Sequence, residues 1–409
     1  MAQTQQTQAT TPAKTQAQQL AAFAVRASYQ DLSDEVRDQL KIRVLDALGC
    51  ALAALGTGPI PVCRQQVDEF GRGGRNTLIG GGTATLPYAS FYLTALVRYV
   101  DFMDNYLGVT ETCHTADNFG AVLAAADYAR ADSQTFMTAL ALAYQVQSRI
   151  TASAPIMAKG FDHTTTLAYS IAAGVSRVLG LDEGQVANAV GICGTDNVGL
   201  AIARAGVLSQ WKGLASSQTA FGCVHDVRLA QRGVTGPLTV FEGPKGLDQQ
   251  MGCSIEVDWA HEKLDIVPQT TVKRYNSEIH TQSAIECALQ LKQQQPFSVG
   301  DVQQIDVATF QVAYDFAGGG AYGDKSQAHT KEQADHSLFY LIAVALLDGD
   351  VMPAQFTQQR IERKRQDSER NRVVARVSLR RCPSGIALRG LQHRAHVAPS
   401  LYEEPPLVR

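Results

Sequence analysis

The sequence has no closely spaced pair of cysteines and no long apolar run. Its eight cysteines are spread along the chain as Cys50, Cys63, Cys113, Cys193, Cys223, Cys253, Cys287 and Cys382. Structural zinc and iron–sulfur sites use closely spaced ligands, so this distribution predicts reduced thiols and no bound metal. A membrane helix needs about 18–20 consecutive apolar residues, and no segment reaches that length. We therefore expect no membrane partner.

The chain also has little net charge and few familiar catalytic motifs. Its 36 lysines and arginines stand against 39 aspartates and glutamates, which gives a formal net charge of -3. Nucleic-acid binding depends on clustered positive charge, so nucleic acid is not an expected partner. Neither HExxH nor GxSxG occurs, and Gly318–Gly323 matches GxGxxG but is followed by a polar stretch instead of a helix. A dinucleotide site is therefore not predicted.

The first residues lack the features of a targeting segment. Residues 1–16 are rich in Gln, Thr and Ala, with Lys14 as the only charge. A secretory signal has a basic start and an apolar middle, and a mitochondrial presequence is rich in Arg. We expect a disordered tail at residues 1–16 and a cytoplasmic location.

Apolar periodicity predicts a mainly α fold. Helical spacing dominates residues 17–264, for example in Val36, Leu40, Val44 and Leu48, and several segments are apolar nearly all round, as in the interior of a bundle. The texture changes at 265–379, where residues 302–310 alternate like a half-buried strand. The pattern predicts a large all-helical domain at 17–264 and a smaller α+β domain at 265–379. Few periodic apolar residues follow, so we expect an atypical, poorly ordered tail at 380–409.

Two carboxylates and a histidine stand close together in the segment from 99 to 118. Asp101 and Asp104 precede His114, which comes just before the apolar segment that starts at Phe119. Each of these groups can hold or release a proton, as proton-transfer chemistry requires. A helix start beside His114 would attract anions and keep the imidazole neutral. The alternative is that the two acids lie on a polar helix face and that His114 caps a helix.

Two lysines farther along occur in unusual settings. Lys212 lies between Trp211 and Gly213, before a segment of small residues, and Lys273 lies within Thr-Val-Lys-Arg-Tyr. Lysines among apolar residues are seldom buried without a partner, so these two are candidates for holding an acidic substrate. Solvated surface positions are the alternative for both. His163 is explained equally well as a helix cap.

At these residues the chain resembles the MmgE/PrpD family, which includes 2-methylcitrate dehydratase and cis-aconitate decarboxylase. The matching pieces occur in the family's order between residues 32 and 352, and each one alone is weakly specific. They are Asp101–Asp104, His114–Gly120, Ser209–Gly213, Gly233–Pro237, Lys273–Tyr275, His280–Ser283 and Ala334–Ser337.

The resemblance implies an all-helical domain with an α+β lid, an active site in the cleft between them, and a homodimer. It implies cofactor-free lyase chemistry on a small di- or tricarboxylate. By position, the expected catalytic residues are His114, Asp101, Lys212 and Lys273. The expected substrate-binding residues are Asp104, Asn105, His163, Arg204 and His280.

The resemblance favours dehydration of a 2-methylcitrate-like hydroxy acid. Asn105 stands where the decarboxylase members have a threonine, which counts against that branch. Within the family, a decarboxylase or an epimerase of a related carboxylate remains the alternative. Family members usually continue past the lid with a strand-containing stretch that returns to the helical domain, and residues 360–409 do not resemble it. A catalytically impaired carboxylate-binding homologue is therefore a further alternative, and a purely structural helical protein is the last.

Overall fold

The computed structural model describes residues 13–109, 111–366, 377–381 and 387–390. Helices dominate these ranges, which confirms the predicted mainly α fold. None of the helices described there is long and apolar enough to cross a membrane.

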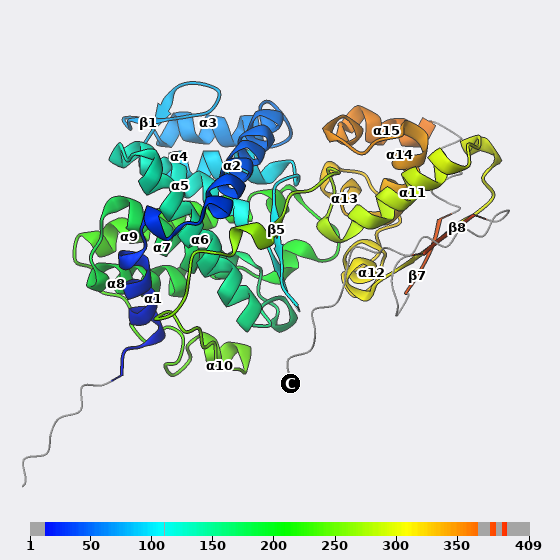
Figure 1. The fold of residues 1–409 in the computed structure, drawn as a ribbon. Coiled ribbons are helices and arrows are strands. Elements are labelled where there is room, and N and C mark those ends of the chain that lie inside the picture. The colour runs from blue at the N-terminus through cyan, green and yellow to red at the C-terminus, as the bar shows by residue number, and fades with distance from the viewer. Residues whose placement is uncertain (1–12, 110, 367–376, 382–386, 391–409) are drawn as a thin grey trace, which may run out of the picture.

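The helices gather in two groups, as Figure 1 shows. The first group comprises α1 (Gln16–Arg26), α2 (Asp34–Ala54), α3 (Ile60–Phe70), α4 (Leu86–Tyr99), α5 (Phe119–Ala129), α6 (Ser133–Ser153), α7 (Thr164–Leu179), α8 (Glu183–Asp196), α9 (Ala215–Gln231) and α10 (Leu247–Met251). The second comprises α11 (Gln282–Gln294), α12 (Gln311–Ala317), α13 (Lys331–Ala334), α14 (Leu338–Asp348) and α15 (Gln358–Gln366).

Three small sheets accompany the helices. Their strands are β1 (Asn76–Thr77), β2 (Thr83–Ala84), β3 (Asn105–Leu107), β4 (Thr112–Cys113), β5 (Thr270–Thr271), β6 (Ile305–Thr309), β7 (Val377–Arg381) and β8 (Ala387–Gly390). The sheet orders are β1-β2, β4-β3-β5 and β7-β6-β8, and β6 pairs parallel with β7 and antiparallel with β8. The strand expected at 302–310 is therefore present as β6.

Local sequence explains why the helices of the first group start and pack as they do. Ser33 accepts a hydrogen bond from the Val36 backbone N–H, and Asp132 accepts one from Thr135, so both residues are N-caps. Helix α5 approaches α4 so closely that a Cβ on Gly120 would lie 2.3 Å from the Thr94 backbone nitrogen. Only glycine permits this approach, which fixes α5 and the residues that precede it.

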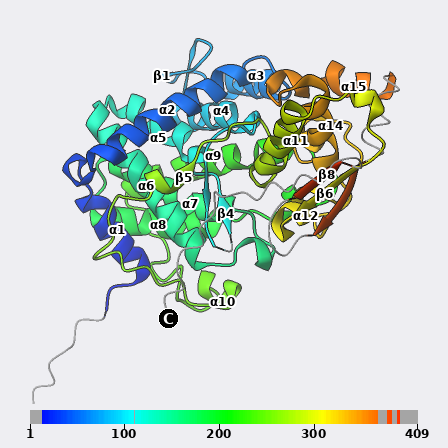
Figure 2. The same ribbon diagram turned by 45° about the vertical axis from the view of Figure 1, so that its right-hand side comes forward.

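Buried apolar side chains form two separate clusters, one within residues 17–267 and one within residues 275–377. The two helix groups (Figure 2) are in contact, because Lys331 of α13 donates a hydrogen bond to the Tyr99 carbonyl oxygen at the end of α4. The predicted boundary near residue 265 falls between the clusters, and the exact domain limits stay a prediction.

Both predicted tails extend partly outside the described residues. Residues 1–12 lie outside them, while Thr15 caps α1 and Lys14 pairs with Glu183. At the other end, residues 380–381 belong to β7 and residues 387–390 form β8, so the tail expected at 380–409 is not structureless at these positions. Pairing with β6 explains the difference, because backbone hydrogen bonds organise a segment that has little apolar periodicity.

Candidate active site

The site is built around Asp101, which follows α4. Its backbone has φ 58°, in the left-handed region, which is uncommon for residues other than glycine but more frequent for Asp and Asn. Its side chain is buried, with 1% of the residue exposed. Unusual backbone conformations cluster at functional sites because they aim a side chain where regular structure would not.

Three cationic side chains surround the Asp101 carboxylate. Arg98 Nη1 lies 2.6 Å and Lys273 Nζ 3.3 Å from Oδ1, and Lys212 Nζ lies 2.7 Å from Oδ2. Lys273 Nζ also donates to the Asp101 carbonyl oxygen at 2.7 Å. Burial alone would raise the pKa of Asp101, but the three cations hold it well below its usual value. The carboxylate is therefore charged.

The sheet β4-β3-β5 explains how residues far apart in the sequence meet here. Strand β3 follows the Asp101 loop, and its antiparallel pairing with β4 returns the chain to His114. Pairing of Asn105 with Thr271 in β5 brings the chain to Lys273 two residues later. Arg43 fixes β5 by donating to the Thr270 hydroxyl and carbonyl oxygens at 2.8 and 2.7 Å.

His114 lies beside this cluster as a neutral imidazole. Burial, the Arg98 charge and His163 hold the pKa of His114 well below its usual value. Arg98 Nη2 is 3.3 Å from His114 Nε2, and a guanidinium can only donate. Nε2 therefore accepts, and the proton of the neutral ring is on Nδ1. Burial and the neighbouring charges account for the neutral ring, and the expected influence of a helix start on His114 stays a prediction.

Lys212 is a buried cation whose pKa is lowered. It is 2% exposed, and burial lowers its pKa to about 8, although Asp101 and Asp335 partly oppose the shift. A lysine with such a pKa can hold a proton at pH 7 and release it at a modest cost.

A cavity with an empty volume of about 980 Å³, its open mouth included, lies against these groups. Its lining combines residues from both helix groups. Seven of the nine predicted site residues line it: Asp101, His114, His163, Arg204, Lys212, Lys273 and His280. The structure thus brings together all four predicted catalytic residues, while their roles stay predictions.

Asp104 and Asn105 are not among the residues that line this cavity. The Asp104 carboxylate accepts hydrogen bonds from Thr115 Oγ1 at 2.6 Å and from Tyr144 OH at 2.7 Å. Asn105 donates to the Met103 carbonyl oxygen at 2.8 Å. Both residues are fully buried, so their contacts hold the loop between Asp101 and His114 and do not face the cavity.

The other three predicted substrate-binding residues lie at the edges of the charged cluster. The Arg204 guanidinium binds both oxygens of Asp162 at 3.0 and 2.9 Å. The His163 ring packs edge-on against His114, with centroids 4.6 Å apart. His280 Nδ1 contacts Glu278 at 2.6 Å, and its ring stacks on Phe316.

Sequence reasoning assigned no role to Arg98 or His336, which also line the cavity. Arg98 is a charged residue in the otherwise apolar helix α4, and such a residue signals a buried ionic partner. His336 Nδ1 lies 2.7 Å from Asp335 Oδ1. The adjacent Asp-His pair was part of a fragment that matched the family, and it could have suggested this contact.

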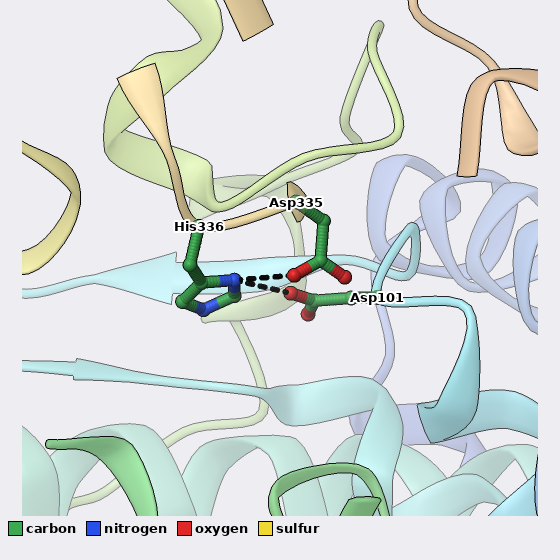
Figure 3. Close-up of side chains that lie close together, drawn as sticks. All are labelled: Asp101, Asp335 and His336. Atoms are coloured by element: carbon green, nitrogen blue, oxygen red, sulfur yellow. Dashed lines mark hydrogen bonds and ion pairs between the residues drawn. The ribbon is translucent and has the colours of Figure 1, made fainter. Parts of the chain in front are cut away.

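Asp101, Asp335 and His336 form the group of potential metal ligands shown in Figure 3, with ligand atoms within 4.8 Å of one another. Lys212 Nζ lies 2.7 Å from Asp101 Oδ2, 3.3 Å from His336 Nδ1 and 3.9 Å from Asp335 Oδ1. Its ammonium already supplies the positive charge that a metal ion would bring, and an ion would have to displace it. The group therefore fits a lysine better than a metal, and the lack of a metal stays a prediction.

This mainly helical protein thus holds a buried cluster of charged residues and histidines beside a cavity. Comparison with known families narrows the class. The family model for the MmgE/PrpD N-terminal domain matches residues 18–260, and that for the MmgE/PrpD C-terminal domain matches residues 275–380. The chain belongs to the MmgE/PrpD family.

Several curated proteins are similar to it over most of its length. The 2-methylcitrate dehydratase of Salmonella typhi is 24% identical over 383 residues, which cover 85% of this chain and 74% of that protein. The 2-methylcitrate dehydratase of Cupriavidus necator is 24% identical over 382 residues, with the same coverage. An alkylcitrate dehydratase from a fungal species is 25% identical over 346 residues, covering 76% of this chain and 65% of that protein.

Proposed function

We propose that this protein is a cofactor-free hydro-lyase that dehydrates a 2-methylcitrate-like hydroxy acid. The observation that carries the proposal is the convergence of Arg98, Lys212 and Lys273 on a single carboxylate, Asp101, beside a cavity. All three cations line the cavity, where the carboxylates of a substrate can bind to them. The names of the dehydratases to which the chain is similar support the same reaction.

In this reaction a C–H bond next to a carboxylate breaks, and its proton goes to a base. The electron pair forms the C=C bond, and the C–O bond on the neighbouring carbon breaks. Negative charge develops on the substrate carboxylate, so fixed cations nearby stabilise the transition state more than the ground state. The Lys212 ammonium, with a pKa of about 8, is suited to protonate the departing hydroxide, which then leaves as water.

An assay of purified full-length protein with 2-methylcitrate, citrate and cis-aconitate tests this proposal. With a hydroxy tricarboxylate as the substrate, we expect the ultraviolet absorbance of a newly formed conjugated alkene. We also expect that treatment with EDTA leaves the activity unchanged. Release of carbon dioxide from any of these acids would indicate a decarboxylase instead of a dehydratase. Inversion of configuration at a carbon atom would indicate an epimerase. Thermal stabilisation by these acids without turnover would indicate a carboxylate-binding protein. Loss of activity that iron or zinc restores would contradict the metal-free chemistry.

His114→Gln is expected to lower kcat by about 10²-fold, the scale of a group that takes part in proton transfer or its orientation. The reason is the position of His114 in the cavity, where its Nε2 accepts from Arg98. Steady-state kinetics with 2-methylcitrate give the effect, and the far-ultraviolet spectrum checks the fold. Turnover within a few-fold of the wild type in a folded variant would contradict a role for His114.

We propose also that the chain forms a homodimer and acts in the cytoplasm. Helix α2 exposes Ile42, Leu45 and Leu52, which are 46%, 71% and 60% exposed and share one helix face by their spacing. An uncovered apolar face of this kind is typical of a protein–protein contact. The mass in solution, measured by light scattering, tests the dimer: a monomer at micromolar concentration would contradict it.

A further inference from the structure

We infer that His336 is the base that removes the substrate proton, and that Asp335 and Lys331 are residues that position it. The inference rests on the proposed dehydration and names a residue for its first step. His336 lines the cavity and lies in the chain between α13 and α14. The geometry around Asp335 carries the argument.

Asp335 is held on both carboxylate oxygens. Oδ1 lies 2.7 Å from His336 Nδ1, and Oδ2 forms an ion pair with Lys331 Nζ at 2.7 Å. Lys331 Nζ also donates to the Tyr99 carbonyl oxygen at 2.6 Å, and so ties Asp335 to the end of α4. Asp335 is completely buried. Burial would raise its pKa, but Lys212, Lys331 and His336 together lower it, so the carboxylate is charged.

The charged Asp335 fixes the tautomer of the His336 ring. A carboxylate oxygen 2.7 Å from Nδ1 is repelled by a nitrogen lone pair and stabilised by an N–H donor. Nδ1 therefore carries the proton, although Lys212 Nζ lies 3.3 Å away and could otherwise donate to it. In the neutral ring, Nε2 then holds the lone pair. Asp–His pairs orient a catalytic base in this way in other enzymes.

Nε2 of His336 is available to take a proton. It points away from both Asp335 and Asp101 in Figure 3. The hydrogen bonds of the His336 ring within the described ranges are made by Nδ1 and leave Nε2 without a partner. The corresponding lone pair of His114 is different, because it already faces the Arg98 guanidinium. Protonation of either ring would place it beside a cation, because Arg98 lies 3.3 Å from His114 and Lys212 lies 3.3 Å from His336. At His336, however, the Asp335 carboxylate 2.7 Å from the ring stabilises the protonated form. His336 is the better base of the two.

The charges that face His336 predict how the base titrates. Asp335, Asp101 and Glu278 favour the protonated ring, while the Lys212 ammonium disfavours it. Burial is the largest effect and, with Lys212, lowers the pKa of His336 below its usual value. The ring is therefore neutral at pH 7 and ready to accept. After proton transfer, Asp335 stabilises the imidazolium, and the proton returns to solvent once the alkene has left.

The test uses full-length wild type, His336→Gln and Asp335→Asn, with His261→Gln as the matched control. His261 forms a similar pair with Asp258 at 2.8 Å, but its side chain is 85% exposed. We expect His336→Gln to lower kcat by about 10²-fold or more with KM changed by less than about threefold, and to slow deuterium exchange into the substrate from heavy water. His261→Gln should match the wild type. In Asp335→Asn, loss of the anion should move the acid limb of kcat/KM to lower pH.

A second measurement does not depend on activity. Nitrogen-15 spectra of the wild-type protein should show His336 with a protonated Nδ1 and a bare Nε2 at pH 7, and the comparison with His336→Gln assigns the signal. A protonated Nε2, or His336→Gln with kcat within about fivefold of an active wild type, would overturn the inference. If the wild type dehydrates no carboxylate, the proposed function fails, and the nitrogen spectrum alone decides the state of His336.

Discussion

Lys212→Met is expected to lower kcat/KM for a tricarboxylate by about 10²–10³-fold, the scale for loss of one electrostatic contact to a transition state. Lys212 contacts Asp101, Asp335 and His336, and it lines the cavity. Its removal takes away one of three cations and the proposed proton donor. Asp101 keeps Arg98 and Lys273 as partners, so the fold is expected to survive. Steady-state kinetics and a thermal melt measure the two effects separately.

A companion variant, Lys273→Met, tests whether the two lysines contact substrate carboxylates. Lys273→Met should lower kcat/KM mainly for substrates with several carboxylates, and less for a monocarboxylate. Lys41→Met is the control, because Lys41 lies on the surface with 67% of its side chain exposed. Equal kinetics on mono- and tricarboxylates in both cavity variants would contradict the proposed contact with substrate carboxylates.

The pH profile gives Lys212 a signature of its own. Because its pKa is lowered to about 8, the ammonium is lost as the pH rises through that value, and kcat/KM of the wild type should fall there. In Lys212→Arg the side chain stays charged at every accessible pH, so that alkaline limb should disappear even if the overall rate is lower. If kcat/KM of Lys212→Arg still fell near pH 8, that fall would have to come from a group other than Lys212.

The sequence predicted the mainly α fold because apolar periodicity and caps are local signals. The N-cap residue Ser33 of α2 and the apolar residues of α4 and α5 can be recognised from sequence windows of a few residues. The strands β3, β4 and β5, of two or three residues each, were not predicted, since segments this short have no periodicity. Yet their pairing sets Lys273 beside Asp101, 172 positions away. Such a contact depends on tertiary structure, and one sequence alone does not encode it in a readable pattern.

The same distinction separates the site residues that were found from those that were missed. Asp101, His114, Lys212 and Lys273 were noticed because their residue types are unusual in their local setting, and all four line the cavity. Asp104 and Asn105 have the right chemistry at the right spacing, but the Asp104 carboxylate is bonded to Thr115 and Tyr144 and the Asn105 amide N–H to Met103. Spacing shows which residues are near one another, and it does not show which way their side chains point.

Asp101→Asn is expected to destabilise the protein by about 3–5 kcal/mol, the usual cost of removing one partner from a buried ionic cluster. Arg98, Lys212 and Lys273 would then lie together with no shared anion. Asparagine is the informative replacement, because it adopts the left-handed backbone of residue 101, φ 58°, as readily as aspartate does. The change therefore isolates the charge. Chemical denaturation at pH 7 measures the difference in the free energy of unfolding.

The pH dependence of that difference identifies its cause. The folded pKa of Asp101 is far below its usual value, so its stabilisation is complete above the ordinary carboxyl pKa of about 4 and is lost as the pH falls towards the folded pKa. The gap between wild type and Asp101→Asn should therefore be constant near neutral pH and narrow in strong acid. Asp38→Asn, at a side chain that is 70% exposed, should show no such gap. If Asp101→Asn were as stable as the wild type at pH 7, the three cations would not depend on this carboxylate, and the electrostatic basis of the proposed site would fail.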